Sequence, residues 1–172
     1  MKKTILLIIC GLCLSGCWDK KIADPNADRK KYEAYYQSIL DNETFLEKSE
    51  NFSIEAVMNK VDDYYRFSVI IDNPKIAMYS VETMAIIDDG SVSINYEVVM
   101  PASGIFDKAY NLLPYQQNEA AGFAGGLILD GVCDKPEVVL LVMVSWRNEK
   151  NTVIYKEFFE LVAKLPTVTI TP

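Results

Sequence analysis

The chain has 172 residues, half of them hydrophobic, and it carries 24 acidic against 17 basic side chains, for a formal net charge of −7. This hydrophobic content predicts a folded domain rather than a disordered chain, and the acidic excess argues against nucleic-acid binding, which needs a basic face. The sequence contains no histidine, which excludes catalytic triads with an imidazole base and zinc sites with imidazole ligands.

The first residues have the pattern of an export leader. Met1–Lys3 is cationic, Thr4–Leu14 is apolar and too short to span a bilayer as a helix, and Leu14-Ser15-Gly16-Cys17 closes the run. This tetrapeptide resembles the lipobox of bacterial lipoprotein precursors, in which the cysteine is lipidated and becomes the N-terminus after cleavage. The resemblance covers only the leader. It implies a signal peptide at 1–16 and two acyl chains on Cys17, which hold a protein durably on a membrane.

With this leader removed, residues 17–24 form a lipidated tether and the folded domain lies in the cell envelope, outside the cytoplasm. Because the leader holds two lysines and no acid, its removal changes the formal charge from −7 to −9. The alternative is an ordinary secretory signal that is cleaved nearby, with the cysteine incidental.

Only one cysteine remains for the folded domain. Cys10 and Cys13 lie in the leader and Cys17 is the lipidation site, which leaves Cys133. The domain therefore forms no internal disulfide and depends on its core. Because no histidine is present to activate a thiol, we expect Cys133 to be a buried small hydrophobic residue rather than a nucleophile.

Residues 25–48 are predicted to be helical. Asp24 is a preferred N-cap residue and Pro25 fits the first helical position. Apolar side chains then recur at spacings of three, four and seven residues, which places them on one side of a helix: Tyr32, Tyr35, Tyr36, Ile39, Leu40 and Leu46. We expect this stripe to pack on the domain itself rather than on a partner or the membrane. Asp41-Asn42 is a candidate break.

From residue 52 the apolar period changes to two, which is typical of strands. Alternating runs at 52–58 and 65–71 are joined by a turn at Asp62-Asp63. A longer strand-like run at 76–87 leads to Asp88-Asp89-Gly90, whose composition is typical of a tight hairpin turn, and to another alternating run at 92–98. The sequence therefore predicts a β-hairpin over 76–98.

The segment 104–126 fits neither the helical nor the strand period. It is long for a loop, and long loops are functional or have structure of their own. Four aromatic residues stand out as a candidate binding patch: Phe106, Tyr110, Tyr115 and Phe123. Exposed side chains here would form an interaction surface, whereas buried ones would belong to a crossover helix that covers the sheet, and burial is the favoured alternative.

The last third of the chain predicts a buried sheet. The continuous apolar run Val138–Trp146 indicates a central strand that is buried on both faces. Residues 156–165 fit both a strand and a helix, and the short turn before them favours a strand. Pro166 ends this element, and 167–172 is a β-prone tail.

These elements predict a mainly β domain over 52–166. Short turns and the lack of βαβ alternation indicate an antiparallel, immunoglobulin-like β-sandwich preceded by an N-terminal helix. The alternative is an α+β cone, in which the helix packs inside one curved antiparallel sheet.

No motif assigns a reaction, a cofactor or a metal to the chain. Asp88, Asp89 and Asp130 supply oxygen ligands of the kind that calcium prefers, but without EF-hand spacing. We therefore expect a non-catalytic, membrane-anchored lipoprotein that binds a protein, a peptide or an envelope polymer through 104–126. The alternative is a structural or assembly lipoprotein that pairs through an open strand edge.

Overall fold

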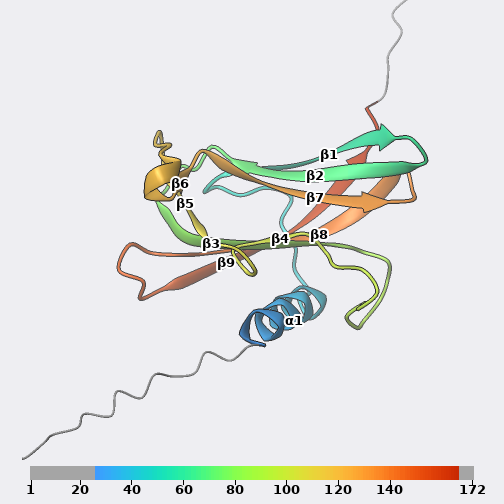
Figure 1. Ribbon diagram of the computed structural model, residues 1–172, viewed down its shortest axis with the longest axis horizontal. Helices are drawn as coiled ribbons and strands as arrows, with labels where there is room; N and C mark the ends of the chain where they lie inside the picture. Colours follow the sequence, from blue (N-terminus) through green and yellow to red (C-terminus); the bar gives the residue numbers. More distant parts are fainter. Residues whose placement is uncertain (1–25, 167–172) are drawn as a thin grey trace, which may run out of the picture.

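The computed structural model describes residues 26–166, which form two facing β-sheets and one helix (Figure 1). The small sheet has the order β1 (Ser53–Val61), β2 (Tyr64–Asp72), β7 (Gly126–Cys133). The large sheet has the order β6 (Phe123–Ala124), β5 (Tyr110–Leu112), β3 (Met78–Ile87), β8 (Glu137–Arg147), β9 (Ile154–Lys164), with β4 (Ala102–Ser103) also paired to β3. The predicted mainly β sandwich is confirmed.

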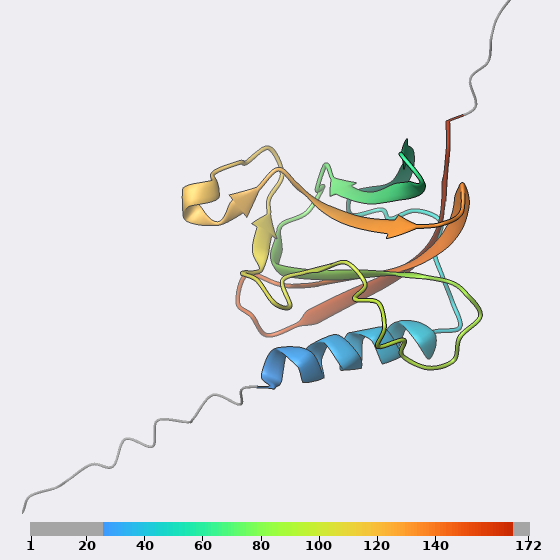
Figure 2. The same cartoon turned by 45° about the vertical axis from the view of Figure 1, so that its right-hand side comes forward.

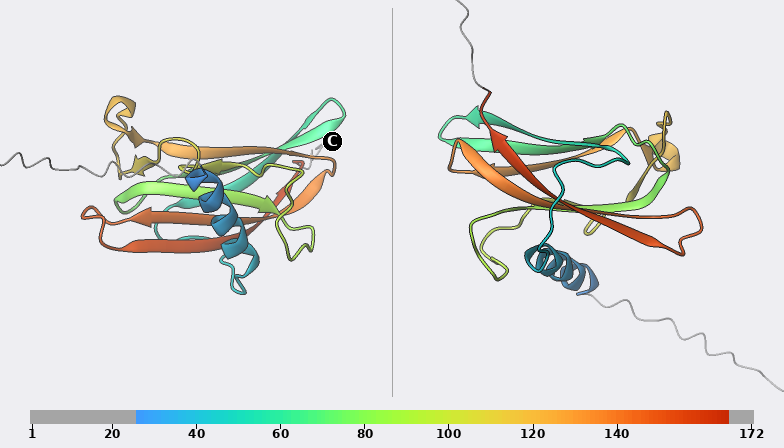
Figure 3. Two further views of the ribbon diagram at one scale, coloured as in Figure 1. Left: turned by 60° about the horizontal axis from the view of Figure 1, so that its bottom comes forward. Right: turned by 180° about the vertical axis from the view of Figure 1, so that it is seen from behind.

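The helix α1 (Ala27–Leu40) crosses the outer face of the large sheet (Figures 1 and 3). The molecule therefore has three layers, with the large sheet in the middle. The helix lies outside the sandwich, whereas the alternative α+β cone required it to pack inside a curved sheet.

The large sheet is apolar on both faces because it separates two hydrophobic clusters. Leu140, Val142 and Val144 face the main core between the sheets, whereas Leu141 and Met143 face α1. This arrangement confirms the prediction that Val138–Trp146 is a central strand buried on both faces.

Three aromatic side chains pack against one another within the main core. Phe52 meets Trp146 edge to face with ring centroids 5.8 Å apart, and meets Phe159 at 5.7 Å. Phe159 belongs to β9, which pairs with β8 over its whole length, so the ambiguous run at 156–165 is a strand, as favoured.

The first two strands form the predicted hairpin. β1 and β2 pair in register from Ser53↔Asp72 to Val61↔Tyr64, which leaves Asp62 and Asp63 as the turn. Asp62 adopts a positive φ of 48°, a conformation that aspartate tolerates better than most residues.

The stripe on α1 packs on the domain itself, as predicted. Tyr32, Tyr36 and Ile39 are buried in the cluster between the helix and the large sheet. The predicted start at Asp24 and Pro25 lies outside the described residues, and the helix begins at Ala27 with Asn26 as N-cap. The helix ends at Leu40, so the rest of the predicted 25–48 segment is not helical.

Polar contacts also hold α1 on the sheet. Lys31 Nζ donates to Glu82 Oε1 at 2.6 Å and to the carbonyl oxygen of Gly104 at 3.1 Å. The hydroxyl of Tyr35 donates to the other carboxylate oxygen of Glu82. Burial, followed by this hydrogen bond, raises the pKa of Tyr35. The neutral phenol is therefore the form that the folded protein favours.

The predicted hairpin over 76–98 is wrong in its second half. β3 forms, but residues 88–101 are a loop in which Val92 is 88% and Val99 is 77% exposed. The turn chemistry is as expected, since Asp88 and Asp89 accept hydrogen bonds from the backbone two residues on. The strand does not follow because β8 occupies one edge of β3, whereas β4 and β5 occupy the other.

Within residues 26–166, no helix is long and apolar enough to cross a membrane. Cys17, the rest of the leader and the tail at 167–172 lie outside the described residues.

Candidate binding site

The segment 104–126 forms neither of the two predicted alternatives, the favoured buried crossover helix or a single exposed aromatic patch. From β5 onward it forms short pieces of structure at one end of the sandwich, at the left of Figures 1 and 2. β5 pairs with β3, β6 runs parallel to β5, and the 3₁₀ turn η1 (Glu119–Ala121) lies between β5 and β6 in the chain.

The structure separates the four predicted aromatic residues. Phe106 is 56% exposed and lies against α1, with its ring centroid 5.5 Å from that of Tyr32. Tyr110 and Phe123 are half-buried in β5 and β6, and Tyr110 packs against the main core. Tyr115 alone is fully exposed, at 105% of its reference area.

Tyr115 occupies an unusual position in a tight turn. The N–H of Gln116 donates to the carbonyl oxygen of Leu113 at 3.2 Å, with Pro114 and Tyr115 as the intervening residues. Tyr115 has a φ of 60°, so the turn has the type II pattern, in which this position favours glycine. A tyrosine here is strained. Its fully exposed ring gains no stabilisation from burial that would offset this strain.

A hollow of about 320 Å³ lies beside Tyr115. Its lining comes from the turn after β2 and from the segment between β5 and β7, and it consists of Asn73, Pro74, Leu113, Tyr115, Gln116, Gln117 and Gly125. None of these side chains is charged. A second hollow of about 440 Å³ shares Gln117 and Gly125 with it, so the two adjoin.

Backbone pairing fixes the base of this loop. Asn118 and Phe123 exchange two hydrogen bonds of 2.9 Å, and the N–H of Asn111 donates to the carbonyl oxygen of Gly122 at 3.0 Å. The side-chain oxygen of Asn118 accepts from Ala121 N, which caps the 3₁₀ turn. The loop therefore presents Tyr115 from a constrained base, which lowers the entropy that a ligand must overcome.

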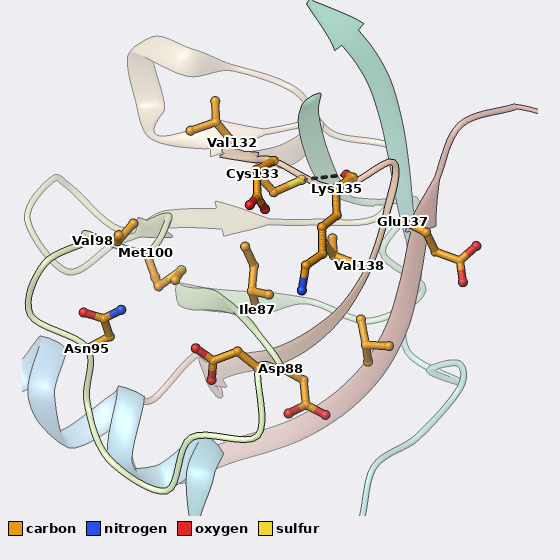
Figure 4. Close-up of a pocket in the computed structure, with 13 residues that line it drawn as sticks. Ile87, Asp88, Asn95, Val98, Met100, Val132, Cys133, Lys135, Glu137 and Val138 are labelled. Atoms are coloured by element: carbon orange, nitrogen blue, oxygen red, sulfur yellow. Dashed lines mark hydrogen bonds between the residues drawn. The ribbon is translucent and has the colours of Figure 1, made fainter. Parts of the chain in front are cut away.

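The opposite end of the sandwich holds a cavity of about 370 Å³ (Figure 4). The loop at 88–100 and the turn between β7 and β8 line it. Its apolar part includes Ile87, Met100 and Val138. Its charged residues are Asp88, Asp89, Asp134, Glu137 and Lys135.

Cys133 lines this cavity and is only partly buried, so the prediction of a buried cysteine is wrong. It is the last residue of β7, where the strand leaves the core for the open end of the sandwich. Its thiol donates to the backbone carbonyl of Lys135 at 3.3 Å. Figure 4 shows the Lys135 ammonium directed away from the sulfur, toward Ile87 and Asp88. With four carboxylates against one ammonium, this is not the electropositive setting of a reactive thiol.

The three aspartates considered for calcium do not meet. Asp130 lies on the outer face of the small sheet, where hydrogen bonds from Arg66 and Ser68, each 2.6 Å long, lower its pKa. Asp88 and Asp89 cap the turn after β3, and the hydrogen bonds from Ser91 lower the pKa of Asp89. Within residues 26–166, no group of three or more histidine, cysteine, aspartate or glutamate side chains is placed to hold a metal ion.

The exposed turn and the uncharged hollow are the features that sequence reasoning missed. Pro114 indicates a turn, but no residue signals that the next position takes a positive φ. Asn73 joins the hollow from a turn about forty positions earlier in the chain. No family model matches this chain, and no curated protein or solved structure matches it.

Proposed function

We propose that this protein is a lipid-anchored, non-catalytic binding module of the bacterial cell envelope. The lipobox-like Leu14-Ser15-Gly16-Cys17 supports the anchor. The observation that carries the binding role is Tyr115, a fully exposed aromatic residue in a strained turn on a constrained loop. Strain of this kind persists where the surrounding structure holds it, and it is concentrated at functional sites.

We also propose that the sandwich is immunoglobulin-like. An immunoglobulin sandwich places strands A, B and E in one sheet and C, F and G in the other. The long strands here have the orders β1-β2-β7 and β3-β8-β9, which correspond to A-B-E and C-F-G if the irregular 88–125 segment replaces strand D. This correspondence supports the proposal. Loops at the ends of such sandwiches are common binding surfaces.

The cavity of Figure 4 does not support a catalytic role for Cys133. A cysteine mechanism would need a base or a cation close to the sulfur, whereas the sulfur contacts a carbonyl oxygen and the local charge is negative. The chain has no histidine to take the missing role. We therefore propose no enzymatic activity.

The anchor is tested by expressing the full chain in a bacterial host and measuring the mass of its N-terminal peptide. We expect the peptide to begin at Cys17 and to carry a diacylglyceryl group, and we expect Cys17→Ser to leave the precursor unprocessed. A peptide that begins elsewhere with an unmodified thiol would contradict the anchor.

The binding role is tested with residues 18–172, which retain every element of the described fold. This chain is mixed with isolated bacterial envelope fragments and the mixture is sedimented. We expect saturable co-sedimentation that weakens in Tyr115→Gly. Lack of saturable binding would contradict the binding module.

A second candidate function is assembly through strand edges. β1 and β9 are the outer strands of the two sheets, and a groove of about 480 Å³ lies between them, lined by Ala56, Met58, Val162 and Leu165 among others. Apolar strand edges promote pairing with other chains. Size-exclusion chromatography with light scattering tests this role. Assembly through strand edges predicts an oligomer that the substitution Val162→Lys dissociates, and a monomeric unmodified chain would contradict it.

A further inference from the structure

We propose that the hollow beside Tyr115 binds a neutral, hydroxyl-rich glycan strand. This inference deepens the proposed binding function and rests on it, because it names the ligand class for the same end of the sandwich. Three properties of the lining support it: its lack of charge, its amide groups and its exposed aromatic ring.

The lack of charge favours a neutral ligand. Charged residues make up 24% of the chain, yet the lining of the hollow contains none. Binding of a charged ligand would require partners of opposite sign, since an unpaired charge loses its hydration. The formal charge of the whole chain is also negative, which disfavours anionic polymers over distances of several ångströms.

The amide groups favour hydroxyl groups on the ligand. Asn73, Gln116 and Gln117 line the hollow, and an amide carries two N–H donors and one carbonyl acceptor. Asn73 Nδ2 already donates to Ser53 Oγ at 3.3 Å. A hydroxyl group both donates and accepts, so neighbouring hydroxyl groups on a sugar ring match such amides. A Cβ atom at position 125 would stand only 3.2 Å from Gln117 Oε1, so the glycine there leaves room for the Gln117 amide at the hollow.

The ring of Tyr115 provides an apolar platform next to these amides. A pyranose ring has C–H groups on its faces and hydroxyl groups around its edge, so it can stack on an aromatic face while its edge bonds to amides. A peptide that is mainly apolar fits less well, because Pro74 and Leu113 are the only aliphatic side chains in the lining.

The second hollow indicates a ligand longer than one sugar. It continues from Gln117 and Gly125 over the ends of β2 and β7, where Ile128 lines it together with the carboxylates of Asp72 and Glu119, which also disfavour an anionic strand. Each hollow lies within the range of about 300–1,000 Å³ that is usual for small-molecule sites. A polymer strand can therefore pass over Gln117 and occupy both.

The first test distinguishes the ligand class in the sedimentation assay with residues 18–172. Envelope fragments are treated with periodate, which cleaves vicinal diols, or with a broad-specificity protease. We expect periodate to abolish saturable binding and protease to leave it. Binding that survives periodate would overturn the glycan proposal but would retain the binding module, whereas untreated fragments that bind nothing would contradict both.

The second test uses soluble probes and residue-resolved detection. Cellohexaose and maltohexaose, whose sugar rings carry the vicinal diols that periodate cleaves, are titrated separately into ¹⁵N-labelled protein, with polygalacturonate as the charged comparison. We expect at least one neutral probe to shift the amide signals of Gln116 and Gln117 saturably, and polygalacturonate to leave them unchanged. Neutral probes that cause no shift at millimolar concentration, or a preference for polygalacturonate, would overturn the proposal.

Variants assign the contacts. We expect Tyr115→Gly to weaken binding about tenfold or more, as removal of a central aromatic contact does, and Gln117→Leu to weaken it about fivefold. Tyr96→Gly is the matched control, because Tyr96 is another exposed tyrosine, in the loop at the opposite end of the sandwich, and it should change affinity less than about twofold. Unchanged affinity in Tyr115→Gly would overturn the assignment.

Discussion

Tyr115 is the residue at which local stability and the proposed function oppose each other. Its φ of 60° costs an L-residue about 1–2 kcal/mol relative to glycine, and its exposed ring recovers none of this through burial. We expect Tyr115→Gly to raise the free energy of unfolding by about 1 kcal/mol, less than the full cost because glycine also gains freedom in the unfolded chain. Urea unfolding measures this change, and a clear loss of stability would contradict the strain.

Tyr35 makes the free energy of unfolding depend on pH in the alkaline range. Burial, and then the hydrogen bond to Glu82, raise the pKa of Tyr35, and burial raises the pKa of Tyr32 and Tyr36. A raised pKa in the folded state contributes stability that is fully present below the pKa of the unfolded chain, about 10 for tyrosine. This contribution is lost as the pH rises above that value, because the unfolded chain then releases protons more readily.

The substitution Tyr35→Phe removes the ionisable phenol and therefore the alkaline loss of stability that Tyr35 causes. At neutral pH the variant loses the hydrogen bond to Glu82 and is less stable by about 1–2 kcal/mol. Above pH 10 its free energy of unfolding falls less steeply than that of the unmodified protein. Thermal melts between pH 7 and 11.5 test both statements, and parallel curves over that range would contradict the role of Tyr35.

Residue-level features were the hardest to predict from the sequence. The stripe on α1 was identified because a helix repeats every 3.6 residues, so burial follows from spacing alone. The exposure of Cys133 depends on where β7 ends relative to the core, and the shape of the hollow depends on Asn73 and Gln117 meeting across the fold. Spacing along the chain carries no signal for either.

Among the elements, α1 is joined to the large sheet by its own apolar cluster. Ile39 is fully buried there with Met84 and Met143. We expect Ile39→Ala to lower the stability of this contact by about 2–4 kcal/mol. Amide hydrogen exchange should then show faster exchange in α1 than in β8, whereas Gln37→Ala, which removes only an exposed hydrogen bond to Asp41, should leave both rates unchanged.

Uniform acceleration of exchange across α1 and the sandwich in Ile39→Ala would contradict a separable helix layer. It would indicate instead that the two apolar clusters unfold as one unit.

Strands were predicted correctly where their periodicity agreed with an available partner. β1, β2, β8 and β9 follow their patterns because each has a partner strand beside it in the chain. Residues 92–98 alternate as clearly as β1 does, yet they form a loop, because both edges of β3 are already occupied. Strand pairing is a property of the whole sheet, and local alternation does not encode it.

In the whole molecule, the large sheet separates two layers, the helix α1 on one face and the small sheet on the other. α1, the first described element after the proposed tether, covers one face. The small sheet covers the other and contributes to the end of the sandwich that carries Tyr115 (Figure 2). The mainly β class and the leading helix were predictable from composition and periodicity, whereas the uncharged hollow beside Tyr115 and the second hollow that adjoins it depend on the long segment between β3 and β7.

The most direct test of the proposed binding surface is the binding isotherm of Tyr115→Gly on untreated envelope fragments, measured beside the unmodified chain. We expect a dissociation constant about tenfold higher or more, in a variant whose free energy of unfolding is equal or higher. Because the variant is not destabilised, such a loss would report the site itself. Equal dissociation constants for the two proteins would contradict the claim that this end of the sandwich is the binding surface.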